Sequence, residues 1–125
     1  MKMLIAEDNE SNYLLYENML SGKYELIHAW NGEEAVDLYN EIKPDLILMD
    51  INMPKMDGYE ATNEIKRINP SVPIIAVTAY AFATDKERML ESGFNGYVSK
   101  PINLNRLNEE IKYVLRDAGI GSGSE

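Results

Sequence analysis

The chain has 125 residues, of which 45% are apolar, so it is long enough for one domain with a substantial hydrophobic core. Its formal net charge of -9 argues against direct binding to nucleic acid or to an anionic membrane, because both favour a basic surface. Cysteine is absent, and neither a membrane-spanning apolar run nor a signal peptide is recognisable. These features indicate an acidic, cytoplasmic, single-domain protein.

Five short apolar runs predict five β-strands. The third and fourth runs are continuously apolar, as in strands that are buried on both faces of a sheet. The second run is more polar, so we expect that strand near an edge of the sheet. The expected strands cover residues 3–6, 24–30, 46–50, 74–78 and 96–100.

A helix is expected after each strand. Helical spacing of apolar residues marks four of them, namely Leu14, Leu15 and Met19; Ala35, Leu38, Tyr39 and Ile42; Ala61, Ile65 and Ile68; and Leu104, Leu107, Ile111, Val114 and Leu115. A capping box of Thr84 and Glu87 predicts the start of the fourth helix, and Asn31 and Glu34 have the same spacing before the second. The domain is expected to span residues 1–118, followed by a flexible tail or cloning scar at 119–125.

The alternation of strands and helices predicts the fold class. Buried strands separated by helices imply a parallel sheet with helices on both faces, joined by right-handed crossovers. For so short a chain we expect the strand order 2-1-3-4-5 of a doubly wound, flavodoxin-like (βα)5 α/β fold. No G-x-G-x-x-G follows the first strand and there is no P-loop, so neither kind of nucleotide site is expected.

Polar residues gather where four of the predicted strands end. In a parallel sheet the carboxyl ends of the strands meet at one edge, and this places Glu7, Asp8, Asp50, Thr78 and Lys100 around one crevice. Taken singly, each has an ordinary explanation as a cap, a strand residue or a solvated charge. Their convergence points instead to a site.

Three carboxylates in one crevice need a cation. Like charges about 5 Å apart repel by roughly 3 kcal/mol per pair at an effective dielectric constant near 20. Oxygen ligands without cysteine favour Mg²⁺ or Mn²⁺ over Zn²⁺. The lone His28 is interpreted as a core or surface histidine and not as a ligand.

A divalent cation beside a carboxylate and a lysine is suited to phosphoryl transfer. Asp50 would be the nucleophile and form an aspartyl-phosphate, while Asp8 ligates the metal and Glu7 holds a metal-bound water. Thr78 and Lys100 would bind the phosphoryl group.

Several motifs in order resemble one family. They are Glu7-Asp8-Asn9, Asp50 followed by Pro54 and Gly58, Thr78-Ala79, and Tyr97 three residues before Lys100-Pro101. Over residues 2 to about 118 the chain resembles a CheY-like response-regulator receiver domain of two-component signalling. Thr-Ala-Tyr-Ala at 78–81 and Lys-Pro-Ile at 100–102 resemble receivers of hybrid sensor kinases more than receivers that serve DNA-binding domains.

The resemblance implies further roles. Asp50 would accept a phosphoryl group from a histidine kinase or a histidine phosphotransfer domain, with the backbone carbonyl of Asn52 as a third Mg²⁺ ligand. The Ala79 backbone N–H would bind phosphate, and Lys100–Pro101 would be a cis peptide bond. Thr78 and Tyr97 would switch the surface of helix 4, strand 5 and helix 5.

The resemblance also bears on partners and turnover. The protein would catalyse its own phosphorylation and slow dephosphorylation without being a conventional turnover enzyme. It would be a monomer or a weak, phosphorylation-dependent dimer, either free-standing or part of a membrane-anchored hybrid kinase. Asn52 and Tyr80 occupy positions at which the family tunes the dephosphorylation rate.

Two other functions stay open. A haloacid-dehalogenase-like phosphatase also uses a strand-end Asp and Mg²⁺, but its second Asp is replaced here by Asn52, which cannot donate a proton. A pseudo-receiver would keep the fold as a binding module without chemistry. Tyr13 and Tyr16 are interpreted either as partner-docking residues or as ordinary surface aromatics, and Asp57 as a turn residue.

Overall fold

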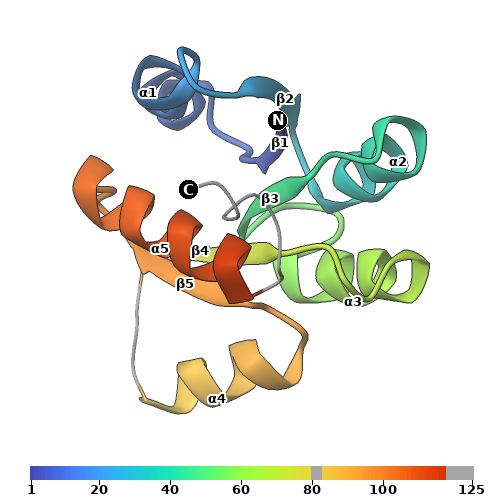
Figure 1. The fold of residues 1–125 in the computed structure, drawn as a ribbon. Coiled ribbons are helices and arrows are strands. Elements are labelled where there is room, and N and C mark those ends of the chain that lie inside the picture. The colour runs from blue at the N-terminus through green and yellow to red at the C-terminus, as the bar shows by residue number, and fades with distance from the viewer. Residues whose placement is uncertain (80–82, 118–125) are drawn as a thin grey trace.

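The computed structural model describes residues 1–79 and 83–117. Strands and helices alternate along the chain, and the five strands form one parallel sheet in the order β2-β1-β3-β4-β5 (Figure 1). The predicted topology is confirmed, including the edge position of the second strand. The elements are β1 (Lys2–Ala6), α1 (Glu10–Leu20), β2 (Glu25–Ala29), α2 (Gly32–Ile42), β3 (Leu46–Asp50), α3 (Gly58–Ile68), β4 (Ile74–Thr78), α4 (Ala83–Glu91), β5 (Gly96–Ser99) and α5 (Leu104–Asp117).

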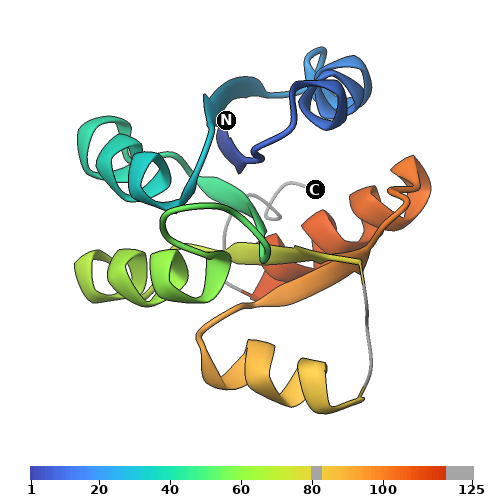
Figure 2. The same ribbon diagram turned by 180° about the vertical axis from the view of Figure 1, so that it is seen from behind.

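Each face of the sheet has its own hydrophobic core. The helices α1 and α5 cover one face, and α2, α3 and α4 cover the other (Figures 1 and 2). Successive strand residues point to opposite faces, so Met3 and Ile5 join the α1–α5 core while Leu4 and Ala6 join the other. Because both faces are covered, the central strands β3 and β4 are apolar up to their last residues, Asp50 and Thr78.

Some of the apolar residues that were predicted to lie on the buried faces of the helices are exposed in the structure. In α1 the buried residues are Tyr16 and Leu20. The predicted stripe was wrong for Leu14 and Leu15, which are 47% and 54% exposed, whereas Met19 is half-buried against the core. Apolar or aromatic residues occupy most of the circumference of this helix, and its periodicity therefore does not define which side is buried. The outermost predicted residues of two other stripes, Ile68 and Leu104, are exposed as well.

Polar side chains cap the helices. Asn31 accepts a hydrogen bond from the Glu34 N–H at 2.9 Å, and Glu34 in turn accepts from the Trp30 N–H at 2.8 Å. Asp57 is the N-cap of α3 and accepts from the Glu60 N–H. The helix α4 already includes Ala83, so the predicted cap position Thr84 lies inside its first turn; Ala is a strong helix former and extends the helix by that residue.

At the edge where the strands begin, which we call the amino edge, a half-buried ammonium group joins three segments. Lys66 of α3 donates to the carbonyl of Val72 at 2.7 Å and to Asn95 Oδ1 at 2.9 Å, with a longer contact to the carbonyl of Pro70 at 3.4 Å. Asn95 Oδ1 also accepts from the N–H of Ile74, the first residue of β4. The network fixes how α3 and β5 meet β4.

The outer edge of β5 is covered by α5 side chains. Glu110 Oε2 accepts from the Tyr97 N–H at 2.9 Å, and Glu110 Oε1 pairs with Arg106 at 2.8 Å. A Cβ atom at Gly96 would collide with the Glu110 carboxylate, so this contact requires a residue without a side chain.

In residues 1–79 and 83–117, no helix is long and apolar enough to span a membrane.

Candidate functional site

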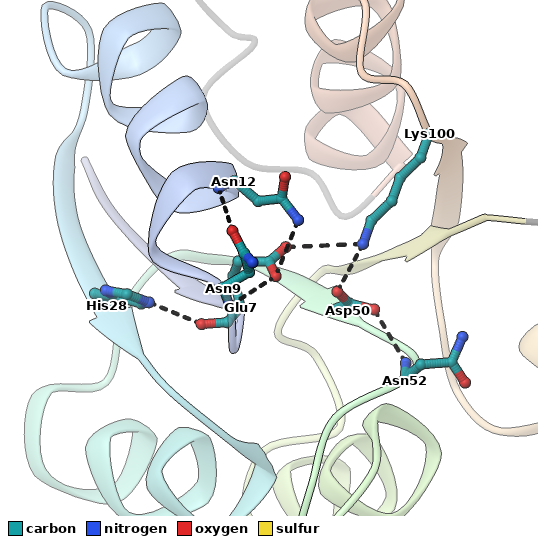
Figure 3. Close-up of polar contacts among 7 residues, drawn as sticks. All are labelled: Glu7, Asn9, Asn12, His28, Asp50, Asn52 and Lys100. Atoms are coloured by element: carbon teal, nitrogen blue, oxygen red, sulfur yellow. Dashed lines mark hydrogen bonds and ion pairs between the residues drawn. The ribbon is translucent and has the colours of Figure 1, made fainter.

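The sheet brings the predicted polar residues together at the edge where the strands end, which we call the carboxyl edge. Carboxylate oxygens of Glu7, Asp8 and Asp50 all lie within 4.8 Å of one another. Lys100, which directly follows β5, reaches across to the same pocket (Figure 3). The convergence expected from strand order therefore exists in the folded chain.

Glu7 is the most deeply buried charge in this pocket, at 1% exposed. Its Oε2 accepts from the Asn9 N–H at 3.1 Å, with a long contact to the Asn12 amide at 3.5 Å. Its Oε1 has no hydrogen-bond partner among the described residues, and the 3.9 Å separation from Lys100 Nζ is an ion contact only. Burial, followed by the charge of Asp50, raises the pKa of Glu7 to about 7, although Lys100 acts in the opposite direction.

Lys100 is the cation of the pocket. Its Nζ lies 3.0 Å from Asp50 Oδ2, and its backbone N–H donates to the carbonyl of Thr78 at 2.8 Å. Burial alone would lower the pKa of Lys100, but the hydrogen bond and charge of Asp50, with the charges of Glu7 and Asp8, raise it. The Lys100–Pro101 peptide bond is cis.

Asp50 is held from the other side by the loop that follows β3. Its Oδ1 accepts from the Asn52 N–H at 3.0 Å. The loop closes where the Gly58 N–H donates to the carbonyl of Ile51 at 2.9 Å, and a Cβ atom at Gly58 would collide with the backbone of Asp50 and Ile51. Gly58 is therefore needed for a close approach between backbones.

Gly32 is a positioning residue that sequence reasoning missed. Its N–H donates to the carbonyl of Met56 at 3.1 Å, and a Cβ atom there would collide with the same residue. The contact joins the start of α2 to the β3–α3 loop. A glycine in the first turn of a helix carries no sequence signal for such a tertiary contact.

The donor set fits a divalent cation with a preference for oxygen. Three carboxylates face a single lysine, and Glu7 Oε1 is buried without a hydrogen-bond donor among the described residues. Mg²⁺ and Mn²⁺ favour such ligands. His28 is not part of this group; its Nε2 donates to the backbone carbonyl of Glu7 at 2.8 Å (Figure 3).

The remaining predicted residues lie around the pocket. Thr78 is buried at the end of β4, and Ala79 follows it on the surface. Tyr97 is half-buried on β5, with Lys86 Nζ 5.4 Å from the centre of its ring. Tyr80 and the predicted tail at 119–125 lie outside the described residues.

Tyr16 differs from its interpretation. Both readings placed it on the surface, but it is 3% exposed, because its large ring packs into the α1–α5 core. Burial, and then the charges of Glu7 and Asp50, raise the pKa of Tyr16. Tyr13 is half-buried and stacks on His28.

A groove of about 480 Å³ runs beside the pocket, between α1 and the segment after β5. Lys100 lines the groove and also contacts Asp50, so the groove is continuous with the acidic pocket. The residues that line it are Asn12, Leu15, Tyr16, Met19, Lys100, Pro101 and Ile102.

Comparison with known proteins shows which family the chain resembles. A family profile described as the response regulator receiver domain matches residues 3–112. The polar-differentiation response regulator DivK of Brucella anthropi is 44% identical over 119 residues, which cover 93% of this chain and 97% of that protein.

Solved structures of receiver and chemotaxis proteins have a similar fold. The receiver domain of the sensor histidine kinase PA1611 of Pseudomonas aeruginosa, which has a magnesium ion coordinated in its active-site cleft, is 36% identical. It superposes with a TM-score of 0.82, covering 94% of this chain and 97% of that one. The chemotaxis protein CheY4 of Vibrio cholerae is 27% identical, with a TM-score of 0.86 and coverage of 91% and 98%.

Proposed function

The chain belongs to the response regulator receiver family, and on that premise we propose that it is a Mg²⁺-dependent phosphorelay receiver that accepts a phosphoryl group on Asp50. The observation that carries the proposal is the pocket itself. Asp50 is oriented by the Asn52 N–H and by Lys100 Nζ, next to a carboxylate pair that fits a divalent cation.

Asp50 is the nucleophile in this proposal. A carboxylate oxygen of Asp50 forms a bond to phosphorus while the bond from phosphorus to the imidazole nitrogen of a phosphohistidine breaks. The electron pair of the broken bond stays on the imidazole. Lys100, 3.0 Å from Asp50, pairs with the carboxylate before the step and compensates phosphoryl charge after it.

The surrounding residues divide the other tasks. Asp8, Asp50 and the backbone carbonyl of Asn52 would hold the metal, with Glu7 acting through a water. When bound, Mg²⁺ supplies positive charge to the phosphoryl oxygens. The Thr78 hydroxyl and the Ala79 backbone N–H would bind those oxygens as well.

Phosphorylation would then change the surface formed by α4, β5 and α5, which a partner would recognise. An added charge of about −1.5 to −2 attracts the Thr78 hydroxyl, and Tyr97 moves inward behind it. The surface has the character of a protein contact: a hollow of about 200 Å³ is lined by Leu90, Tyr97 and Tyr113 among others. Leu90 and Tyr113 are 68% and 58% exposed.

The partner that supplies the phosphoryl group would be a histidine kinase or a histidine phosphotransfer domain. The relatives include both a response regulator and the receiver of a sensor kinase. A hybrid-kinase origin, a domain ending near residue 118, and a monomer or weak phosphorylation-dependent dimer belong to the same proposal. So does slow autodephosphorylation without conventional turnover.

The test is phosphorylation by a small phosphodonor in the presence of Mg²⁺, followed by intact mass measurement. We expect one acid-labile phosphoryl group per chain, absent in Asp50→Asn and retained in the neighbouring control Asp57→Asn. Rapid, repeated hydrolysis of phosphomonoesters would show a phosphatase instead. No phosphorylation either with or without Mg²⁺ would show a pseudo-receiver.

A further inference from the structure

Three aromatic rings stack in series beside the pocket, outside the residues that the proposed function uses. The rings of Tyr13 and His28 are parallel within 1°, with centroids 3.8 Å apart. The ring of Trp30 follows His28 at 4.1 Å with a tilt of 35°. We call Tyr13, His28 and Trp30 the aromatic stack; its outer member, Trp30, is 43% exposed.

The stack is held in place by contacts to the backbone. His28 Nε2 donates to the carbonyl of Glu7 at 2.8 Å, and the Trp30 N–H donates to Glu34 Oε1 at 2.8 Å. These bonds fix the ring of His28 and the backbone that carries the Trp30 ring. A surface ordered before binding loses little conformational entropy when a partner docks.

The basic residues in this half of the protein lie at one edge of the sheet, together with acidic residues such as Glu25 and Asp45. Residues 1–45 contain ten acidic and three basic residues. The basic residues Lys2, Lys23 and Lys43 lie at the start of β1, before β2 and after α2, all at the amino edge. The carboxyl edge, where the stack ends in Trp30, carries the acidic residues Asp8, Glu10, Glu33 and Glu34.

The π faces of the stack also lack a cation from within the part of the chain that the structure describes. Cation–π contacts there involve the rings of Tyr39, Tyr59 and Tyr97. An exposed indole among carboxylates is a surface that attracts positive charge from outside.

We propose that the aromatic stack and the carboxylates around it form a docking surface for an arginine-bearing segment of a partner protein. A guanidinium group stacks flat on an aromatic face and at the same time donates two parallel hydrogen bonds to a carboxylate, which an ammonium group does not. Anionic partners such as nucleic acid are repelled by the same carboxylates. The inference goes beyond the proposed function, because docking requires no phosphoryl group.

Trp30 is the only tryptophan in the chain, so its fluorescence reports directly on the surface. The probe is a blocked peptide, Gly-Arg-Gly-Arg-Gly, compared with Gly-Lys-Gly-Lys-Gly at physiological ionic strength. We expect a saturable change in Trp30 emission, with the arginine peptide bound at least about threefold more tightly than the lysine peptide. Equal affinity for both peptides would overturn the proposal in favour of general electrostatic attraction.

Single and double variants test which residues form the docking surface. By calorimetry we expect Trp30→Leu to weaken binding of the arginine peptide about tenfold and Trp30→Phe to weaken it less. The double variant Glu10→Gln/Glu33→Gln should bind several-fold more weakly. The charge-matched control Glu25→Gln/Glu41→Gln removes two exposed carboxylates from the amino edge and should bind as the parent does.

Equal weakening by the two double variants, or unchanged binding by Trp30→Leu, would overturn the proposal. Thermal unfolding of each variant confirms that it is folded. Phosphorylation of Asp50 by a small phosphodonor should persist in all of them, so failure of the docking surface and failure of the proposed function give different results.

Discussion

The half-buried charge of Lys66 and the buried charge of Glu7, at opposite edges of the same sheet, have opposite surroundings. At the amino edge, the Lys66 ammonium group is surrounded by neutral oxygen acceptors from Val72, Asn95 and Pro70. At the carboxyl edge, one oxygen of Glu7 has no hydrogen-bond donor among the described residues, and two further carboxylates lie nearby. Burial shifts both pKa values toward the neutral form, lowering that of Lys66 and raising that of Glu7.

We interpret Lys66 as a charge that stabilises the fold and Glu7 as a charge that serves the candidate metal site. Removal of Lys66 should cost stability, because the carbonyl of Val72 would lose its charged donor and Asn95 Oδ1 would keep only the Ile74 N–H. Removal of an acidic residue from the pocket should increase stability, because the charges there repel one another until a cation binds. The four predictions that follow test this contrast, beginning with the largest expected effect.

We expect Lys66→Met to lower the free energy of unfolding by about 3 kcal/mol, because Asn95 Oδ1 and the carbonyl of Val72 lose a charged donor. Urea unfolding measures the change. The control is Arg67→Met, whose exposed ion pair with Glu64 contributes at most about 0.5 kcal/mol. Equal losses in the two variants would mean that Lys66 is an ordinary surface charge.

Mg²⁺ should stabilise the protein at the carboxyl edge. At a free concentration one hundred times the dissociation constant, the free energy of unfolding should rise by about 2.7 kcal/mol. Lys66→Met should retain this increase, whereas Asp50→Asn should lose most of it. NaCl at matched ionic strength is the control, and an equal increase in Asp50→Asn would place the ion elsewhere.

The metal-free protein should lose stability as the pH rises. Because the pKa of Glu7 is raised from 4.5 to about 7, the folded state holds more protons than the unfolded state between those pH values. Stability therefore falls as the pH rises through this window, by an amount on the order of 2 kcal/mol. Urea unfolding at pH 5 and 7.5 measures it.

Glu7→Gln is the comparison for that measurement, because it removes the titrating group and should flatten the pH dependence. Saturating Mg²⁺ should flatten it as well, since a bound cation favours the ionised carboxylates. An unchanged slope in Glu7→Gln would assign the pH dependence to other residues.

Asp8→Asn should stabilise the metal-free protein by about 1 kcal/mol. The gain is smaller than the bare repulsion between the carboxylates, because Asp8 is exposed and solvent screens its charge. The matched control Asp37→Asn, on the exposed side of α2, should change stability by less than about 0.5 kcal/mol. Unchanged or lower stability in Asp8→Asn would show that the pocket is not strained by charge.

The fold and the pocket were predictable for the same reason. Each strand is a short apolar run, and strand order alone determines which strand ends are neighbours, so Asp8, Asp50 and Lys100 converge without any tertiary information. A carboxylate placed at the end of a buried strand has few other environments available to it.

Contacts that depend on packing geometry were not predictable. Tyr16 was assigned to the surface because α1 has apolar residues on most sides, and only the packed neighbours decide which side is buried. Gly32 and His28 act through the backbone carbonyls of Met56 and Glu7, and backbone groups leave no trace in the sequence. For the same reason, the sequence did not predict that Lys66 has several hydrogen-bond acceptors, whereas Glu7 Oε1 has no donor among the described residues.

The covered edge of β5 limits the ways in which a partner can bind this side of the protein. With the Tyr97 N–H already bonded to Glu110, an extended chain cannot add to the sheet there as a further strand without first displacing the Arg106–Glu110 pair. Recognition of this side must then depend on side-chain shape, and the same cover protects the folded protein against edge-to-edge aggregation at high concentration.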